Sequence, residues 1–353
     1  MIASPSYLVP LAFLALLPLG ASLGGAWTFL AAIAVPLFLI VLDKGLGHAP
    51  TGELGDGGRV SRWLPRLYIA FQLAATAWLA TRVARGLPVI EIVGLVASTG
   101  VTTGVFGFLA AHEMIHSHER GELALGMTFL ASAFYMHFHI AHLFGHHRRA
   151  ATYDDPVSAR LGESLYAFVL RSVPGQVREA WAHECERLRR ARAPAYSFRN
   201  RLILYFAVEI AMAAGLALVS VPALAFVLCV AAIAVGLLEA FNYVAHYGIL
   251  RRRGADGGFE PLMPEHSWNS SNWMNNSALF NMGRHSDHHV HPVRSFEQLE
   301  PIADEAELPS GYAAAILTAL VPPLWRRVMD PRAKAIAKAR MHWRALRCGK
   351  VED

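Results

Sequence analysis

The stretch IVGLVASTGVTTGVFGFLAAHEMIHSHE, residues 92–119, joins an apolar run to a cluster of histidines. Residues 92–111 contain no charged side chain, and a helix of about 20 apolar residues spans the hydrocarbon core of a bilayer. Ordinary membrane spans avoid titratable groups, so histidines at the end of such a run mark a functional site. This stretch therefore predicts a membrane helix that ends in a functional site.

Three further histidine clusters lie beside other apolar runs: HIAHLFGHH at 139–147, NYVAHYG at 242–248 and RHSDHH at 284–289. Neutral imidazole is a common ligand for iron, zinc and copper. The nine histidines that we expect to bind metal are His112, His116, His142, His146, His147, His246, His285, His288 and His289. Together the clusters predict a membrane-embedded metal oxidase or hydroxylase.

The composition supports a membrane protein with a single domain over residues 1–353. The chain has a mean hydropathy of +0.33 and only 17% charged residues, too apolar for an ordinary soluble domain. It contains no repeat or linker, and its three cysteines do not make a disulfide framework. It also lacks a CxxC metal ribbon, so an electron carrier of that kind would be a separate chain.

We expect an all-α integral membrane protein with about six transmembrane helices. The first apolar run has no cationic start and continues into a second run, so we read it as an uncleaved span rather than a signal peptide. The expected spans lie near residues 7–22, 26–42, 66–82, 90–111, 202–219 and 223–243.

Arginine-rich segments indicate the orientation in the membrane. Arginines gather at 59–66, in the loop after the fourth span and at 251–253, which share one side if the spans pair as hairpins. That side should be cytoplasmic, in a bacterial-type inner membrane. The segments 112–200 and 244–353 would then hold all four histidine clusters at the cytoplasmic face. The net charge of +5 is what this bias predicts, although it would also suit an acidic electron-transfer partner. We expect no nucleic-acid partner.

Two further apolar segments are not expected to cross the membrane. Leu123–Ala141 joins two histidine clusters that should share one site, so it should pack within the protein. Gly311–Val328 contains two prolines and ends in arginines, which is typical of an interfacial helix.

The spacing of the histidines suggests two metal ions. On an α-helix, residues four apart point the same way, which would pair His112 with His116, His142 with His146, and His285 with His289. Adjacent histidines, as at 146–147 and 288–289, diverge by about 100° and do not easily bind one ion from the same helix. We therefore expect neighbouring histidines to serve different ions.

A site built only from histidines has uncharged ligands, so nearby acidic groups should orient the rings and offset the metal charge. Glu119 and Asp154 also lie close to the clusters, but a role as solvated surface acids explains them equally well. The acidic candidates for this supporting role are Glu113, Asp155, Glu239 and Asp287. We expect no catalytic residue beyond the ligands themselves.

The motifs HEMIHSHE, HLFGHH, NYVAHYG and GRHSDHHVHPVRSF resemble those of the membrane alkane 1-monooxygenases within the fatty-acid desaturase/hydroxylase superfamily. The resemblance continues through DDPVSARLGESLYAFVLRSVPG, PEHSWNS and LVPPLWRRVMDP, and it covers about residues 43–332. It implies a six-helix membrane fold and two iron ions held by the nine histidines. It also implies hydroxylation of a terminal C–H bond of an n-alkane by O2, which gives a primary alcohol. The implied electron donor is rubredoxin or ferredoxin with an NAD(P)H-dependent reductase.

Two positions depart from the alkane hydroxylase pattern. Those enzymes usually carry Glu where this chain has Ala141 and Ala245. Related xylene-type side-chain monooxygenases also lack these acids, which makes an alkyl-arene methyl monooxygenase the alternative reading. A fatty-acyl desaturase or hydroxylase is a more remote one.

Two other classes of protein share parts of the pattern. HEMIH fits the HExxH signature of a zinc protease, with Glu113 as general base, but three protein ligands suffice for a catalytic zinc and seven clustered histidines would have no role. A metal carrier would hold its site near the bilayer midplane rather than at one face.

An apolar substrate would enter from the lipid into a channel between the spans. The residues expected on the helices that line it are Val35, Phe38, Leu39, Phe106 and Leu109.

Overall fold

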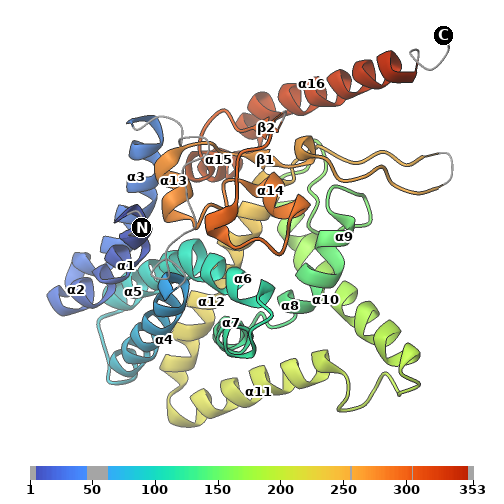
Figure 1. Ribbon diagram of the computed structural model, residues 1–353. Helices are drawn as coiled ribbons and strands as arrows, with labels where there is room; N and C mark the ends of the chain where they lie inside the picture. Colours follow the sequence, from blue (N-terminus) through green and yellow to red (C-terminus); the bar gives the residue numbers. More distant parts are fainter. Residues whose placement is uncertain (1–4, 46–62, 255–256, 304, 349–353) are drawn as a thin grey trace.

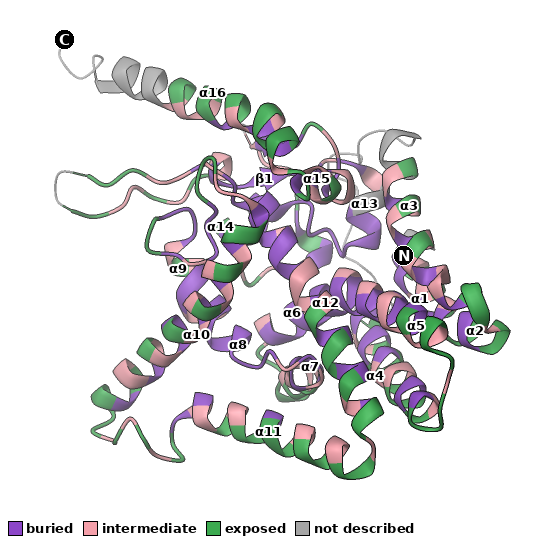
Figure 2. Cartoon of the chain, turned by 180° about the vertical axis from the view of Figure 1, so that it is seen from behind, coloured by how far each residue is buried: buried purple, intermediate pink, exposed green. Residues whose placement is uncertain are grey.

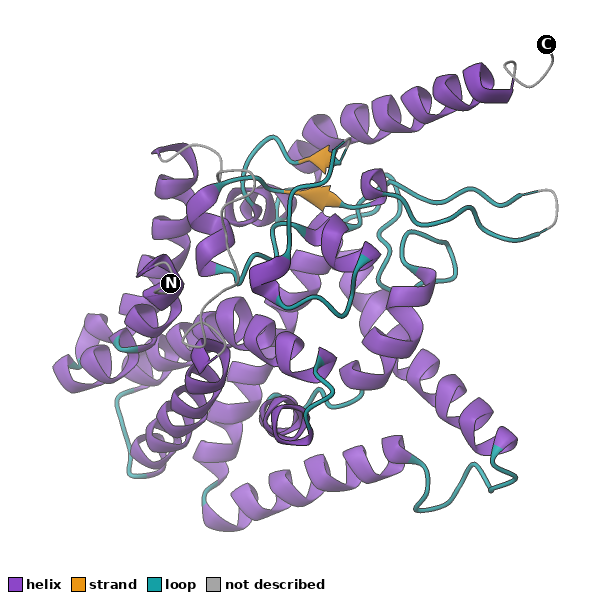
Figure 3. Cartoon of the chain, in the orientation of Figure 1, coloured by secondary structure: helices purple, strands orange, loops and turns teal. Residues whose placement is uncertain are grey.

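The computed structural model describes residues 5–45, 63–254, 257–303 and 305–348 as a mostly helical protein (Figures 1 and 3). The arginines expected at 59–62 lie outside these residues. The N-terminal elements are η1 (Pro5–Leu8), α1 (Val9–Leu14), α2 (Leu16–Leu23), η2 (Gly25–Phe29), α3 (Leu30–Gly45), α4 (Trp63–Ala84), α5 (Val89–Thr102), η3 (Thr103–Gly107), α6 (Phe108–His116) and α7 (Arg120–Ser132).

The middle of the chain holds α8 (Phe138–Ile140), η4 (Ala141–His146), α9 (His147–Arg149), α10 (Leu165–Arg190), α11 (Arg201–Val219) and α12 (Val221–Ala245). The C-terminal part holds η5 (Pro264–His266), β1 (Trp268–Asn269), α13 (Trp273–Ala278), α14 (His285–Val290), η6 (Phe296–Gln298), β2 (Ala306–Glu307), α15 (Tyr312–Ala319) and α16 (Pro322–Cys348). Among the described residues, the parallel pairing of β1 and β2 over two residues and an isolated antiparallel bridge between Arg253 and Phe259 depart from an all-α fold.

Within the part of the chain that the structure describes, four helices are long and apolar enough to cross a membrane: Trp63–Ala84, Val89–His116, Arg201–Val219 and Val221–Ala245. The second of these is a continuous helix made of α5, η3 and α6. It runs past the expected end at residue 111, so His112 and His116 occupy its last turns rather than the segment after it.

The first two expected spans are apolar helices of about the predicted length, but they are too short for full crossings. The apolar helices there cover Val9–Leu23 and Gly25–Val41, and a helix of 15 residues is about 22 Å long, below the ~30 Å of a hydrocarbon core. The α1 and α2 helices are separate elements on either side of Ala15, and Gly24, at φ +69°, ends α2. The prediction of six full spans is therefore supported by length for four of them.

The ends of α4, α5 and α12 that lie away from the histidines are on one side of the molecule, whereas α11 lies across α12 (Figure 1). The turns at 24–25, 85–88 and 220 lie at the left and lower left of Figure 1, whereas α9 and α14 lie at the opposite end of the helices. Gly25 N–H donates to the Glu91 carboxylate, which joins two of these turns. All of the histidine-bearing elements thus gather at one end of the helices.

The two remaining apolar segments fold within or against the body. The α7 helix has 13 residues, too few for a crossing, and packs on α6 and α4. The expected helix 311–328 is instead two helices, α15 and α16, because Pro322 and Pro323 cannot continue the hydrogen-bonding of α15. Beyond the body, α16 projects away from the other helices (Figures 1 and 3).

Buried residues concentrate where α5, η3 and α12 meet (Figure 2). Gly100 and Gly104, four residues apart, face α12, and small residues at this spacing allow membrane helices to approach closely. A Cβ atom on Gly100 would lie 2.7 Å from Ile233 Cβ. This contact holds the helix that ends in His112 and His116 against the helix that ends before His246.

We predict that Gly100→Ala lowers the thermal midpoint of unfolding in detergent, because the added Cβ overpacks Ile233, a change that costs about 1–3 kcal/mol. Gly236→Ala on α12 is the control, since nothing lies within 4 Å of its Cβ position. An equal midpoint for the two variants would contradict this packing.

Candidate metal centre

Four elements bring the nine histidines together at one end of the long helices. The end of α6 carries two, the η4–α9 turn three, the residue after α12 one, and α14 three. Their ligand nitrogens form two groups, each within a sphere small enough for one ion: His112, His116, His142, His147 and His288, which we call the five-histidine group, and His146, His246, His285 and His289, which we call the four-histidine group. In both groups every pair of ligand atoms lies within 4.8 Å.

The five-histidine group has a tight cluster of Nε2 atoms. His142 Nε2 lies 2.8 Å from His112 Nε2 and 3.1 Å from His116 Nε2. His147 Nε2 lies 3.0 Å from His142 Nε2 and 3.2 Å from His116 Nε2. His288 adds a buried Nε2 atom that has no hydrogen-bond partner among the described residues.

This arrangement fits a cation better than hydrogen bonds. A neutral imidazole has one N–H and one bare nitrogen, so His142 Nε2 can join only one of its three close neighbours through a proton. The other contacts would set lone pairs against each other. At about 2.1 Å from one ion, ligand nitrogens at right angles lie about 3.0 Å apart, and in a tetrahedron about 3.4 Å apart. The observed separations match the former.

The four-histidine group repeats this spacing. His285 Nε2 lies 3.0 Å from both His246 Nε2 and His289 Nε2. The ring of His146 lies 4.6 Å from that of His246 and 4.8 Å from that of His289, centroid to centroid. Imidazole donors in this number suit iron, zinc or copper, so both groups fit a transition metal.

Asp155 fixes the ring of His146. Its Oδ2 atom lies 2.9 Å from His146 Nδ1, and both side chains are buried. Because an ionised carboxylate only accepts, His146 Nδ1–H donates and Nε2 is left bare toward the four-histidine group. Ser158 Oγ–H and Val157 N–H donate to the same carboxylate and hold it in place.

A π-helix decides which histidines share a group. The predicted pair His142 and His146 is wrong, because η4 is a π-helix over Ala141–His146 and its wider turn aligns residues five apart. His142 therefore meets His147 in the five-histidine group, while His146 turns to the other. His112 with His116, and His285 with His289, lie on α-helices and share groups at the spacing of four.

The members of each adjacent pair separate. His147 and His288 belong to the five-histidine group, whereas His146 and His289 belong to the four-histidine group. Two neighbouring side chains thus face two different groups, as the spacing predicts.

Three of the four acidic candidates contact other partners. Glu113 accepts a hydrogen bond from Phe296 N–H. Glu239 accepts from Tyr135 and Gln176, and joins α12 to α10. Asp287 pairs with Arg294 and His291 instead. Each is close to a ligand in sequence, but on a helix a neighbour points in another direction.

Burial keeps the ligand rings neutral. It lowers the pKa of His142, His147, His288 and His289 well below the ordinary value, and the neighbouring imidazoles lower it further. For His285, burial lowers the pKa to about 3. Neutral imidazole is the form that binds metal.

One supporting contact was missed from the sequence. Arg149 ion-pairs with the buried carboxylate of Glu179 on α10, and a Cβ atom on Gly145 would overlap that carboxyl group. The π-helix and α9 are therefore held against α10. Glu179 lies thirty residues from Arg149, and no local pattern marks the pair.

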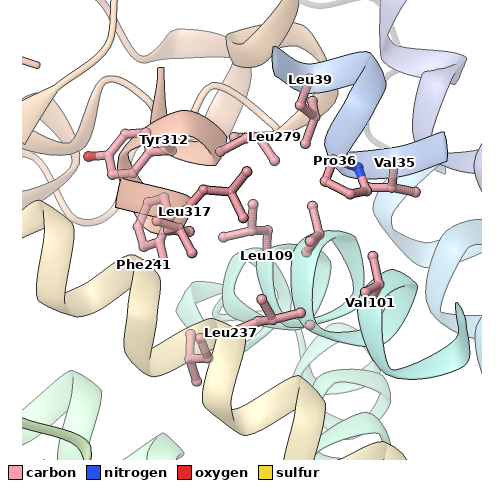
Figure 4. Close-up of a pocket in the computed structure, with 15 residues that line it drawn as sticks. Val35, Pro36, Leu39, Val101, Leu109, Leu237, Phe241, Leu279, Tyr312 and Leu317 are labelled. Atoms are coloured by element: carbon pink, nitrogen blue, oxygen red, sulfur yellow. The ribbon is translucent and has the colours of Figure 1, made fainter. Parts of the chain in front are cut away.

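An apolar cavity of about 220 Å³ begins beside the centre (Figure 4). Leu109, one turn before His112, and Phe241 lie in its wall, and the Phe241 ring is 5.6 Å from that of His285. Tyr312 contributes its ring, while its hydroxyl donates to the Trp268 carbonyl oxygen outside the cavity.

The expected channel residues divide in two. Val35, Leu39 and Leu109 line the cavity. Phe38 and Phe106 do not, and both pack against Phe13 instead.

The two alanines that depart from the expected motifs are both buried. Ala141 packs in a small apolar cluster with Ile140, Ala180 and Leu202, and Ala245 precedes His246 at the end of α12.

Comparisons with known proteins agree with these motifs. The sequence model for "Fatty acid desaturase" matches residues 87–319. Alkane 1-monooxygenase 2 of Pseudomonas aeruginosa is 35% identical over 328 residues, 90% of this chain and 87% of the relative. Alkane 1-monooxygenase 1 of the same organism is 37% identical over 77% of this chain and 68% of its own length. The xylene/toluene monooxygenase hydroxylase component of Pseudomonas putida is 27% identical over 86% and 81%.

We predict that Asp155→Asn weakens metal binding by about 10- to 100-fold at one ion, because His146 loses the charged acceptor that sets its tautomer. Asp154→Asn is the matched control, since Asp154 is exposed and pairs only with Arg253. Metal content after dialysis against a weak chelator measures both. Equal retention in the two variants would refute the role of Asp155.

We also predict that Gly145→Ala displaces Glu179, shifts the π-helix and lowers metal content. Gly121→Ala on α7 should retain the metal of the parent protein, because nothing lies within 4 Å of its Cβ position. Full metal content in Gly145→Ala would show that the π-helix does not depend on this contact.

Proposed function

The chain belongs to the fatty acid desaturase family, and we propose that it is an alkane 1-monooxygenase that converts the terminal C–H bond of an n-alkane to a primary alcohol. The observation that carries this proposal is the pair of all-histidine groups at the end of an apolar cavity. The alkane 1-monooxygenases of Pseudomonas aeruginosa and Acinetobacter baylyi, 35–37% identical to it, support the substrate class.

The metal in this proposal is iron, with one ion in each group and the nine histidines as ligands. Two irons there would activate O2 with electrons from outside, so that one oxygen atom enters the substrate and the other leaves as water. The histidines hold the ions at fixed positions, and Asp155 keeps His146 in the tautomer that offers Nε2.

The cavity walls would select and orient the substrate. Apart from Tyr312, every lining residue is apolar or glycine. Transfer of a hydrocarbon from water into this cavity is therefore favourable, whereas a polar molecule would lose its hydrogen bonds to water without replacing them. Leu109 and Phe241 lie at the histidine end, where they would hold the terminal carbon near the metal and keep water away. Leu317 on α15 is 49% exposed, so the cavity borders the outer surface and a hydrocarbon could enter from lipid.

The electrons would come from a separate protein. We propose a rubredoxin or ferredoxin, reduced by an NAD(P)H-dependent enzyme, because this chain has no CxxC pair or dinucleotide-binding motif. The protein is an integral membrane protein, and we propose that it sits in the inner membrane with its histidines at the cytoplasmic face.

The alternative substrate is an alkyl-arene methyl group. The xylene/toluene monooxygenase relative favours it, as do Ala141 and Ala245, which leave no acid at two positions beside the ligands.

To test the proposal, cells express the protein together with a rubredoxin and its reductase. The cells then receive ¹⁸O₂ and a mixture of n-alkanes, alkylbenzenes and fatty acids. We expect the label in a terminal alkanol by mass spectrometry. Label in a benzylic alcohol instead would move the chain to the xylene-type branch, and label in no product from iron-loaded protein would contradict the proposal.

We predict that His147→Ala abolishes this turnover and lowers iron content, because His147 contributes to the five-histidine group. His183→Ala should do neither, since His183 belongs to no group and only approaches Glu179 at 3.8 Å. An active His147→Ala enzyme would remove that residue from the ligand set.

We further predict that Val35→Trp shifts the preference toward shorter alkanes, because the indole would fill part of the cavity. Val41→Trp on the same helix is the control, since Val41 is exposed and outside the cavity. Product profiles from hexane to hexadecane that are identical in both variants would show that this cavity does not hold the substrate.

A further inference from the structure

The two histidine groups differ in their distance from water. All members of the four-histidine group are buried, whereas His116 and His147 of the five-histidine group are half-buried. The ring of His147 also lies 5.0 Å from that of His289, so the two groups adjoin. Water can thus approach one group, and the other lies behind it.

A polar pocket of about 440 Å³ ends on His116. Its walls come from the ends of α4 and α6, from α7 and from the segment 293–298, and these three helices lie together in Figure 1. Its rim is open, because Glu119 is exposed and Val293 is 75% exposed. The pocket therefore connects the surface to a side chain of the five-histidine group.

The charges of the pocket favour a cation. The lining includes four glutamates, Glu113, Glu119, Glu122 and Glu297, and two arginines, Arg66 and Arg294. Arg66 ion-pairs with Glu122 within the wall, and Arg294 is directed to Asp287, which is not part of the wall. A cleft with one dominant sign of charge concentrates ions of the other sign.

The apolar cavity offers no such path. A metal ion would have to shed its water among side chains such as Leu109 and Phe241 that offer no ligand in return, which is strongly unfavourable. Of these two cavities, the polar pocket is the one that suits a hydrated cation.

We propose that the polar pocket is the path by which metal ions enter and leave the protein. The ion of the five-histidine group exchanges directly through the pocket, with His116 as the first ligand that an entering ion meets. The ion of the four-histidine group exchanges only by way of the five-histidine group. This inference rests on the proposed function in one respect, that the nine histidines hold two metal ions.

The path predicts two rates of metal release. Iron(II)-loaded protein in detergent is mixed with an excess of a chelator that absorbs visible light when it binds iron(II). We expect two phases of equal amplitude, one ion in each, with the faster phase belonging to the five-histidine group. In Asp155→Asn, where His146 is loosened, the slower phase should change and the faster one should not.

Two variants at the rim test the pocket itself. Val293→Trp narrows the mouth, and Glu119→Lys reverses a charge there; neither residue is one of the nine histidines. Each should slow the fast phase by about threefold or more, and the effect of Glu119→Lys should shrink at high salt. Glu186→Lys makes the same charge change at an exposed position on α10 and should leave both phases as they are.

The outcomes separate the path from the function. Release of both ions at one rate, or a fast phase that neither rim variant slows, overturns the path while two ions per chain still support the proposed function. A starting content below two ions per chain contradicts the proposed function and this inference together.

Discussion

The rest of the structure depends on one constraint: nine neutral imidazoles must share a small buried volume with their bare nitrogens about 3 Å apart. Without a cation such nitrogens repel, since one proton can bridge only two of them. The long helices therefore have to supply rigid ends that meet at one place. The close approach of α12 at Gly100 and Gly104 holds two of these helices together. One of them ends in His112 and His116, and the other ends just before His246.

The π-helix η4 determines the directions in which three histidine side chains point. Three histidines on a short turn must serve two centres, and an α-helix would send His142 and His146 to the same one. The wider turn sends His142 and His147 to one group and His146 to the other. Asp155 then fixes the tautomer of His146, and the pair of Arg149 with Glu179 holds the turn against α10.

Much of the site could be predicted because it is built from histidine clusters next to apolar helices. A histidine cluster and an apolar run can each be recognised in a short stretch of sequence. The nine histidines, four of the long helices and the cavity residues Val35 and Leu109 follow from such patterns. The pairing of His142 with His147 could not be predicted in this way, because no residue type marks a π-helical turn. Likewise, Glu239 and Asp287 lie near ligands in sequence, but they turn toward Tyr135 and Arg294. The Tyr135–Glu239 contact joins segments 104 residues apart, which one sequence does not mark, and at Asp287 the seven-residue spacing to Arg294 does not reveal that the two side chains pair.

The most direct test of the account is the metal content of the purified protein beside two single variants, one from each group. We expect two ions per chain in the parent protein and about one in each of His288→Ala and His246→Ala, with different ions retained and hence different spectra. One ion per chain in the parent, or the same ion retained in both variants, would contradict the division of the nine histidines into two metal sites.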